Sequence, residues 1–452
     1  MQKALLWKIA TIFGLILLLL IPLALIQNKI HERASYKAEV KQSIAESWTG
    51  RQSFLGPVLV LPYIVQWEDK VWDPQAEQYQ KVVKTGRENM YIFPQSMQLE
   101  SQLETELRYK GIYKVPVYKN TVVAEGGFST LEIKNRLRDI TQINEFIKWE
   151  EPYISIALSD PRGIDKIPQL NWFNKRLDIK PGTKISFWQH GVHAPLSMNL
   201  YDEMNAHEKS IPFDLNLNLR GMETFGVLPL AKEMSVSIRS SWPHPSFYGA
   251  FLPSSRNVTS DGFSANWKIT SFATDVNNKL LTCQNGNCLP FNELEFGVSL
   301  FEPVDVYAQS DRATKYGVLF IVFVFIAFFV FEMLNRLPLH PVQYALIGLA
   351  VAIFYLLLIS LSEHIDFSLA YGISTVCCVS LMFGYFRTIL KSLRVASYFS
   401  LSVLLVYGLL YLIIRSEDYA LLMGALLCFS SLGVVMYSTR NINWDEVTAY
   451  RK

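Results

Sequence analysis

The sequence predicts a membrane protein of the α + β class. We expect an N-terminal transmembrane anchor, a large periplasmic, antiparallel, sandwich-like β domain and a C-terminal five-helix transmembrane bundle. The last third of the chain is a series of apolar segments joined by short polar stretches. Another apolar run lies near the N-terminus. Between them hydrophobic residues recur every second position, which is typical of strands that bury one face.

Composition agrees with a chain that is partly embedded in lipid. Half of the 452 residues are hydrophobic and 18% are charged, which is a high apolar share for a purely soluble protein. The formal net charge is only +2, and no long run of one sign is present. The sequence therefore shows no basic cluster of the kind that binds nucleic acid, and we expect the lipid bilayer, not nucleic acid, as a partner.

The first element is an apolar run over residues 9–26 that follows Lys3 and Lys8. A cleaved signal peptide is the competing interpretation. Its hydrophobic region would be about 7–15 residues long, and a small-residue cleavage site would follow. This run is longer, and residues 26–29 (Ile-Gln-Asn-Lys) make a poor site. We therefore predict a cytoplasmic N-terminus and an uncleaved anchor within residues 1–28.

A stalk helix is predicted over residues 29–50. Four apolar residues recur at every fourth position and would form one stripe: Tyr36, Val40, Ile44 and Trp48. A neighbouring stripe is basic and consists of Arg33, Lys37 and Lys41. Two interpretations stay open. The basic stripe contacts lipid head groups, or the helix docks on its own domain.

Residues 51–312 form the predicted β domain. Alternation is clearest at residues 97–109, 213–219, 236–238, 263–269 and 294–300. Residues 58–65 and 153–158 are more continuously apolar, as in buried strands, and residues 133–149 are ambiguous, with a short helix as one interpretation. Regular strands separated by turn residues favour an antiparallel sandwich, built as one subdomain or two.

Five apolar segments make up the predicted membrane block at 313–440: residues 316–331, 344–361, 367–386, 395–414 and 419–437. With flanking residues, each approaches the roughly 20 positions that a spanning helix needs. Alternate joints carry the positive charge, at Arg336, Arg387, Lys391, Arg394 and Arg440. The positive-inside rule then gives six spans, both termini inside, a periplasmic loop over 29–312 and a cytoplasmic tail at 441–452.

No Asp, Glu, Lys, Arg or His lies at the centre of any apolar run. We expect Glu332 to pair with Arg336 at the cytoplasmic interface. Small residues in the block are expected to be close-packing positions between helices, among them Gly372, Gly384, Gly424 and Gly433. A channel or exporter through the bundle is the weaker alternative, because such pathways usually need an ionisable group at depth.

Cys283 and Cys288 flank the tight-turn pair Asn285-Gly286. On an oxidising periplasmic side they are candidates for a disulfide bond. A metal site is less favoured, because two thiols alone supply half of a zinc site.

Histidines supply the other candidate metal ligands. His190 and His193 are three positions apart, and His207 or His244 could be a third ligand of a metal-assisted hydrolase. The chain lacks an HExxH pattern, a G-x-S-x-G elbow, a phosphate-binding loop and a dinucleotide fingerprint. We therefore expect no enzyme, no cofactor and no metal.

The most unusual soluble stretch is residues 241–253, Ser-Trp-Pro-His-Pro-Ser-Phe-Tyr-Gly-Ala-Phe-Leu-Pro. Its three prolines are expected to prevent regular strand pairing. One hypothesis is a loop that grips a partner protein or lipid, and the other is a lid over the core of its own domain. The candidate binding residues are Trp242, His244, Phe247, Tyr248 and Phe251.

This stretch resembles the CreD family of bacterial inner-membrane proteins. The resemblance continues at residues 311–316 (Asp-Arg-Ala-Thr-Lys-Tyr), 328–332 (Phe-Phe-Val-Phe-Glu) and 339–344 (Leu-His-Pro-Val-Gln-Tyr). It implies a role in cell-envelope integrity, under a two-component regulator, with tolerance of colicins and β-lactams. It supplies no reaction, ligand or catalytic residue. The function expected is binding of an unidentified envelope protein or lipid through the periplasmic domain.

Overall fold

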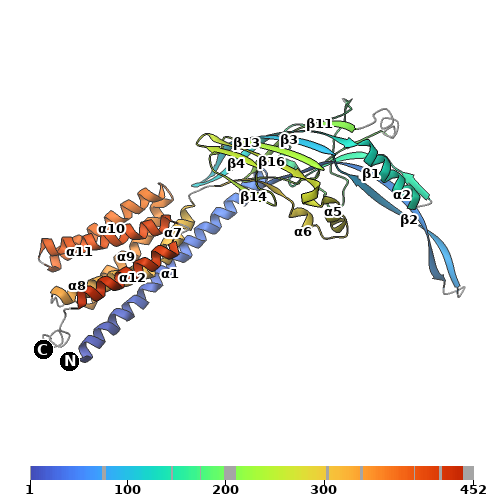
Figure 1. The fold of residues 1–452 in the computed structure, drawn as a ribbon. Helices are drawn as coiled ribbons and strands as arrows, with labels where there is room; N and C mark the ends of the chain where they lie inside the picture. Colours follow the sequence, from blue (N-terminus) through green and yellow to red (C-terminus); the bar gives the residue numbers. More distant parts are fainter. Residues whose placement is uncertain are drawn as a thin grey trace. The chain divides into compact units, whose positions relative to one another are not determined.

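The computed structural model describes residues 2–73, 78–143, 146–173, 175–197, 210–301, 305–335, 340–390, 392–416 and 420–440 (Figure 1). Contacts divide the chain into a helical unit of residues 1–39 and 304–452 and a β-rich unit of residues 40–303. His207, Arg336 and the predicted tail at 441–452 lie outside the described residues.

Helix α1 (Gln2–Ser47) is continuous. The anchor and the stalk that we predicted on either side of residue 28 are parts of this one helix. Its second half is rich in Lys, Glu, Gln and Ala, which are strong helix formers, and Lys29 pairs with Glu32 one turn later. In the predicted stalk stripe, Val40 and Ile44 are buried.

The β-rich unit contains two sheets. A sheet of nine described strands has the order β14-β17-β12-β1-β6-β10-β9, and β2 and β5 also pair with β1. Its strands are β1 (Gln52–Asp73), β2 (Gln78–Ile92), β5 (Phe146–Trp149), β6 (Tyr153–Leu158), β9 (Lys180–Pro181), β10 (Gly191–Pro195), β12 (Thr224–Val227), β14 (Pro245–Gly249) and β17 (Phe296–Leu300).

The second sheet has eight described strands in the order β15-β16-β13-β3-β4-β11-β7-β8. They are β3 (Ser96–Lys110), β4 (Tyr113–Ser129), β7 (Gln169–Trp172), β8 (Lys175–Arg176), β11 (Ser210–Met222), β13 (Glu233–Ser240), β15 (Ser255–Thr259) and β16 (Gly262–Thr270).

One hydrophobic core joins the two sheets, as in a sandwich. Phe54 and Leu59 reach it from the nine-stranded sheet, and Leu99, Leu217 and Trp267 reach it from the other. The predicted alternation is confirmed for residues 97–103 of β3 and 213–219 of β11, because every second side chain there is buried, but Leu107 and Tyr109 of β3 are exposed.

The prediction of a wholly antiparallel domain is wrong at two places. Strand β1 pairs with β12 in parallel, and β3 pairs with β13 in parallel. Parallel neighbours need a long crossover, and in both cases the rest of the domain provides it. Both partners therefore come from distant parts of the chain.

A second core lies on the nine-stranded sheet and is covered by short helices. Helices α4 (Ser271–Thr274), α5 (Val276–Gln284) and α6 (Leu289–Asn292) follow β16. Leu280 and Phe291 pack with Val58 and Val60 of β1, whereas Leu59 belongs to the main core. Strand β1 is thus buried on both faces, which explains its continuous apolar run. The ambiguous residues 133–149 fall within helix α2 (Thr130–Ile143) and strand β5.

The C-terminal part of the helical unit begins earlier than predicted, with α7 (Val306–Lys315). Asp305 caps this helix by accepting a hydrogen bond from the backbone N–H of Tyr307. The helices that follow are α8 (Gly317–Asn335), α9 (Pro341–Ser362), α10 (Phe367–Leu390), α11 (Leu393–Arg415) and α12 (Ala420–Thr439).

Several of these helices are candidates for membrane spans. Among the described residues, four are long and apolar enough: α1, α9, α10 and α11. Helices α7 and α8 would together make a fifth, with a bend of 43° between them, and α12 holds the shorter apolar stretch Leu422–Gly433. An N-terminal apolar helix, a β-rich middle and apolar C-terminal helices are therefore present.

Close packing at glycine occurs at a position that we did not single out. A Cβ atom at Gly348 on α9 would meet Leu19 of α1 and Phe325 of α8. The prediction was wrong for Gly372, Gly384, Gly424 and Gly433, where a Cβ atom would meet nothing within 4 Å among the described residues.

Candidate functional site

The aromatic stretch at 241–253 is partly a strand. Pro245–Gly249 forms β14, which pairs antiparallel with β17, so the prediction that prolines prevent pairing is wrong here. Strand β14 lies at the end of its sheet, and an edge strand tolerates proline because one side of its backbone needs no ladder partner.

Most of its aromatic side chains point into the domain. The Phe247 ring lies 5.8 Å from that of Phe263 and 5.9 Å from that of Trp267, and Phe251 packs edge-on against Phe296. The Trp242 indole N–H donates to the carbonyl of Phe301. These contacts favour the lid interpretation of the stretch.

Its polar groups divide between the interior and the surface. The Tyr248 hydroxyl donates to Glu295 over 2.8 Å, and burial followed by the Glu295 charge raises the pKa of Tyr248. Glu295 also accepts from the Ser53 hydroxyl and so joins β14 to β1. His244 and Leu252 are exposed, as are the small residues Ser241, Ser246 and Ala250.

The candidate metal ligands are not brought together. His193 lies on β10 and His244 next to β14, towards opposite ends of the nine-stranded sheet. His193 is buried, its Nδ1 lies 2.6 Å from the carbonyl oxygen of Gly182, and burial lowers its pKa. His190 is exposed. Within the described ranges, no group of three His, Cys, Asp or Glu side chains is placed to hold a metal.

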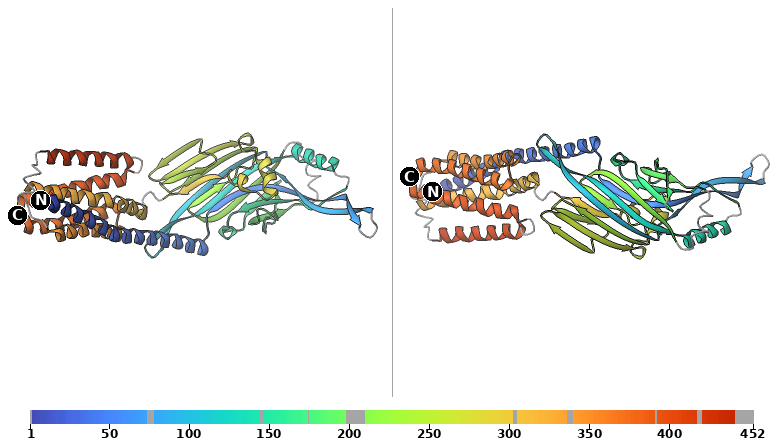
Figure 2. Two further views of the ribbon diagram at one scale, coloured as in Figure 1. Left: turned by 90° about the horizontal axis from the view of Figure 1, so that it is seen from below. Right: turned by 90° about the horizontal axis from the view of Figure 1, so that it is seen from above.

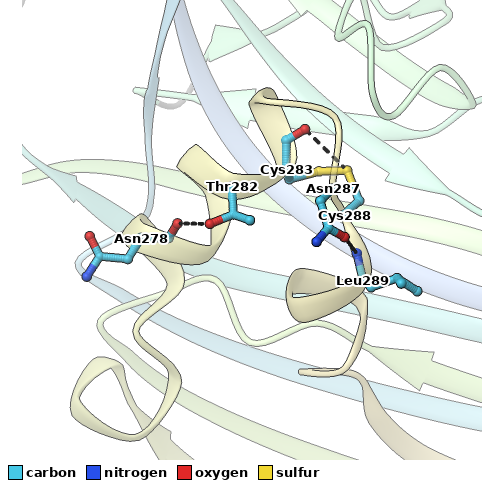
Figure 3. The surroundings of a disulfide bond; sticks show 6 residues. All are labelled: Asn278, Thr282, Cys283, Asn287, Cys288 and Leu289. Carbon is cyan, nitrogen blue, oxygen red and sulfur yellow. Dashed lines mark hydrogen bonds between the residues drawn. A yellow bond between two sulfur atoms is a disulfide. The ribbon is translucent and has the colours of Figure 1, made fainter.

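Cys283 and Cys288 are joined by a disulfide bond (Figure 3). The turn between them links helices α5 and α6 and is not a β-hairpin. Gly286 has a φ of +96°, a conformation that glycine adopts readily. Cys283 is buried in the second core, so the disulfide fastens the short helices that cover β1.

The basic stripe on α1 is used for ion pairs inside the protein. All three of its residues have an acidic partner, in the pairs Arg33–Glu363 at 3.5 Å, Lys37–Asp305 at 3.6 Å and Lys41–Glu223 at 2.5 Å. Burial alone would raise the pKa of Glu223, but hydrogen bonds and charges from Lys41 and Arg51 lower it. This pairing favours docking of the helix over contact with lipid head groups.

The end of α1 is capped by the Asp160–Gly163 motif. The Arg162 guanidinium donates to the carbonyl oxygens of Ala45 and Glu46 in the last turn, where the helix dipole favours a cation. Asp160 holds that guanidinium and accepts from the Gly50 N–H. Burial opposes ionisation, yet these hydrogen bonds lower the pKa of Asp160 to about 2.

Glu332, which we predicted to pair with Arg336 at the interface, has other partners among the described residues. Its side chain is buried, forms an ion pair with Lys8 of α1 and accepts a hydrogen bond from the Tyr344 hydroxyl over 2.8 Å. The Lys8 ammonium also lies 5.7 Å from the centre of the Tyr344 ring. Three helices thus meet at one neutralised polar cluster.

A polar pocket of about 550 Å³ lies on the face of the eight-stranded sheet that carries its polar residues. Carboxylates of Glu125, Asp214 and Glu233 line it, and Asn171 donates to Asp214. Its apolar lining residues Met97 and Phe213 are themselves buried. The pocket therefore lacks the exposed aromatic anchors that dominate protein-binding surfaces.

A two-stranded ribbon offers such anchors. Beyond residue 66, β1 and β2 leave the body of the sheet and continue as a pair (Figures 1 and 2). Seven residue pairs, from Trp67–Lys84 to Asp73–Gln78, extend it by roughly 24 Å at the usual rise per residue.

The ribbon exposes large apolar side chains on both faces. Six of them are between 41% and 68% exposed: Trp67, Val71, Trp72, Tyr79, Val82 and Val83. Trp72 and Tyr79 contact each other edge-on at 5.1 Å. Two-stranded ribbons are marginally stable alone in water, so this concentration of apolar surface points to a contact site.

Charges on the ribbon balance one another. Lys81 pairs with Glu68 at 2.6 Å, and Lys84 pairs with Asp69 at 2.5 Å, each across the two strands. All four side chains are largely exposed, so the pairs are screened by water and contribute little to stability. The ribbon carries no strong excess of either sign.

Sequence reasoning missed this ribbon. A strand that is wet on both faces has no one-sided hydrophobic pattern, and the apolar residues at positions 71, 72, 82 and 83 are adjacent, not alternating. The available signal was the density of tryptophan, tyrosine and valine on either side of Asp73-Pro74, a turn-type pair.

Comparison with known proteins gives consistent results. The family model described as inner membrane protein CreD matches residues 4–445. The chain is 35% identical to "Inner membrane protein CreD" of Escherichia coli (strain K12), in an alignment that covers 98% of this chain and 94% of that protein.

Proposed function

Because the chain belongs to the CreD family of inner membrane proteins, we propose that it supports cell-envelope integrity as a non-catalytic binding protein. Six spans place both termini in the cytoplasm and residues 29–312 in the periplasm. The distribution of arginine and lysine among the helix joints supports this orientation.

The binding role is supported by one observation above the others, the exposed apolar ribbon of the β-rich unit. Aromatic side chains with large accessible area dominate the energetics of protein contacts. The ribbon therefore contacts another envelope component. The stretch at 241–253 acts as the lid that closes the sandwich, since Trp242, Phe247 and Phe251 pack against its core.

A non-catalytic role fits the polar groups of the β-rich unit. His193 and Glu295 are engaged in contacts that hold strands together. The hydrolase alternative would need His190, His193 and His244 to converge, and they are spread along the sheet. No residue is therefore assigned a catalytic role.

The orientation is tested with single cysteines and a membrane-impermeant maleimide on intact spheroplasts. Phe272→Cys, at a side chain that is 99% exposed in the β-rich unit, is expected to react without permeabilisation. Lys452→Cys is expected to react only afterwards. The opposite labelling order would refute the periplasmic placement.

The binding role is tested by removing the aromatic anchors of the ribbon. The double substitution Trp72→Ser with Tyr79→Ser is expected to abolish the tolerance of β-lactams that the wild-type gene restores to a deletion strain. Phe272→Ser removes an exposed aromatic elsewhere in the unit and is the matched control. Membrane levels of all variants are measured, and unchanged tolerance at equal levels would refute the proposal.

A further inference from the structure

A hairpin protrudes from the end of the sandwich at which the chain enters from α1 and leaves for α7. The backbone N–H of Glu223 donates to the carbonyl of Pro116 in β4, and the Glu223 carbonyl accepts from the N–H of Leu300, the last residue of β17. Beyond Pro116, β3 and β4 continue for three more residue pairs and a turn, which is roughly 10 Å at the usual rise per residue. We call residues 107–114 the hairpin tip.

The hairpin tip runs back along α1 towards the apolar part of that helix. The Arg108 guanidinium lies 4.0 Å from the centre of the Trp48 ring. Lys110, which is two residues nearer the turn, donates to the Ser43 hydroxyl, five residues closer to the apolar run of α1. The turn of the hairpin therefore lies on the side of the sandwich from which α1 continues to its membrane-spanning part.

The length of the chain limits how far this end of the sandwich can lie from the next candidate span. Only residues 301–305 separate β17 from α7, which with α8 makes such a span. Five residues reach at most about 18 Å when they are fully extended. Because the hairpin tip projects from the same end, it is held near the surface of the membrane.

One face of the hairpin tip exposes large apolar side chains. Arg108 and Lys110, which contact α1, lie on the other face. Leu107 and Tyr109 alternate with them along β3 and are 37% and 68% exposed. Ile112, in the turn, is 44% exposed. Three large apolar side chains are thus accessible within six residues of one another.

The hairpin tip is also basic. It contains Arg108, Lys110 and Lys114 and no carboxylate. Arg108 pairs with Glu106, but within the described parts of the chain neither Lys110 nor Lys114 forms an ion pair. Exposed tyrosine and aliphatic side chains beside unpaired lysines are typical of protein segments at the boundary between lipid and water.

We propose that the hairpin tip binds anionic phospholipid head groups at the surface of the membrane that the helices of this chain cross. Tyr109 and Ile112 lie among the head groups, and Lys110 and Lys114 contact the phosphates. This inference goes beyond the proposed function, because it depends neither on the ribbon nor on the side of the membrane on which the β-rich unit lies.

Other occupants fit this place less well. The five-residue connection at 301–305 leaves little room at this end of the sandwich for a folded partner protein. A second copy of the hairpin tip would bring like charges together, since the tip has three cations and no carboxylate. The head-group layer of the chain's own membrane is already adjacent and supplies the opposite charge.

Fluorescence quenching in nanodiscs tests the inference on the full-length protein. Ile112→Cys carries an environment-sensitive fluorophore, in a background in which the three free cysteines are replaced by serine. The discs contain phosphatidylglycerol and a lipid with a nitroxide quencher, either on its head group or near the end of its acyl chain. The control is Phe272→Cys, at a side chain that is 99% exposed and follows the strand end opposite the hairpin tip.

The head-group nitroxide is expected to quench the fluorophore at Ile112→Cys strongly, and the acyl-chain nitroxide is expected to quench it weakly. Neither should quench the fluorophore at Phe272→Cys. Quenching at Ile112→Cys that is as weak as at the control would overturn the inference.

The role of the lysines is tested in the same discs. Lys110→Gln with Lys114→Gln is expected to lower the ratio of bound to free hairpin tip roughly fivefold for each lysine, as their attraction to an anionic surface predicts. The matched control, Lys134→Gln with Lys268→Gln, removes two exposed lysines elsewhere in the unit and should leave the ratio unchanged. Equal ratios for the two double variants would overturn the inference.

Photo-crosslinking in living cells distinguishes the possible occupants. A benzophenone amino acid replaces Tyr109 or, as the control, Phe272. Mass spectrometry is expected to find phospholipid adducts at Tyr109 and none at Phe272. Adducts at Tyr109 with another protein or with a second copy of the chain, or no adduct there, would overturn the inference. The tolerance assay with the Trp72/Tyr79 double variant addresses the ribbon alone, so the proposed function and this inference can fail separately.

Discussion

The Lys8–Glu332–Tyr344 cluster allows a quantitative test of how α1 is held in the helical unit. The side chains of Lys8 and Glu332 are only 10% and 1% exposed, so both charges are removed from water. We consider the single substitutions Lys8→Met and Glu332→Leu and the double substitution. All three keep apolar volume at the site.

Breaking a buried ion pair by removing one partner typically costs about 3–5 kcal/mol, because the other charge stays in a poorly solvated place. Glu332→Leu also removes the acceptor of the Tyr344 hydroxyl, whose loss costs about 1–3 kcal/mol when the partner was charged. Replacing both partners by apolar groups is often neutral or stabilising. The double variant should therefore be much closer to the wild type than either single variant.

The assay is equilibrium unfolding of the purified protein in detergent micelles, with the coupling energy taken from the double-mutant cycle. We expect a coupling of at least about 2 kcal/mol, in the sense that the second substitution recovers the loss from the first. Tyr344→Phe, which keeps the ring and the ion pair, should cost less than Glu332→Leu. Additive single effects, or single variants as stable as the wild type, would refute the view that this pair holds α1.

Three further outcomes are expected. Burial lowers the pKa of His193 below 6.5, so the unfolded state binds more protons than the folded state as pH falls below that value. The stability of the β-rich unit should therefore drop from pH 7.5 to 5.5. In denaturant titrations, His193→Phe should reduce this dependence of stability on pH. Replacing Cys283 and Cys288 by serine should cost about 2 kcal/mol for so short a loop, and reductant should lower the thermal midpoint of the wild type but not of this variant. Gly348→Ala should destabilise by about 1–3 kcal/mol through overpacking, whereas Gly384→Ala, with open space beside it, should be neutral or stabilising in the same thermal assay.

Local pattern was sufficient where one face of an element is dry. Met97, Leu99 and Leu103 of β3 alternate with polar or charged residues because the core lies on one side of the sheet, and that period is visible in any short window. The apolar segments of the C-terminal helices are found in the same way. For these elements, the local sequence is enough to predict which residues are buried.

Long-range partners leave no local trace. Glu332 pairs with Lys8, which is 324 residues away, and nearby Arg336 was the only partner that the sequence suggested. The parallel neighbours of β1 and β3 are likewise set by the whole sheet. Helix α7 was missed because its buried face includes the polar residues Ser310 and Thr314. Its sequence therefore shows no apolar stripe.

The candidate sites show the same limit. The sequence shows which residues of 241–253 are aromatic but not which way their side chains point. The position of β14 at the edge of its sheet brings Phe247 against Trp267. The ribbon was invisible because neither of its faces is buried. Surfaces that become dry only in a complex do not produce an intramolecular pattern.

The parallel pairing of β1 with β12 also sets the order of events during biosynthesis. The N-terminal strand cannot complete its sheet until β12 and then β17 have been made. Synthesis of the intervening stretch of about 250 residues takes roughly 10–50 s at usual elongation rates. Throughout that interval the start of β1, at residues 52–54, is without its β12 neighbour, although β2 and β6 are made earlier and pair with the rest of the strand. Helices α7 to α12 are made after the last strand of this sheet.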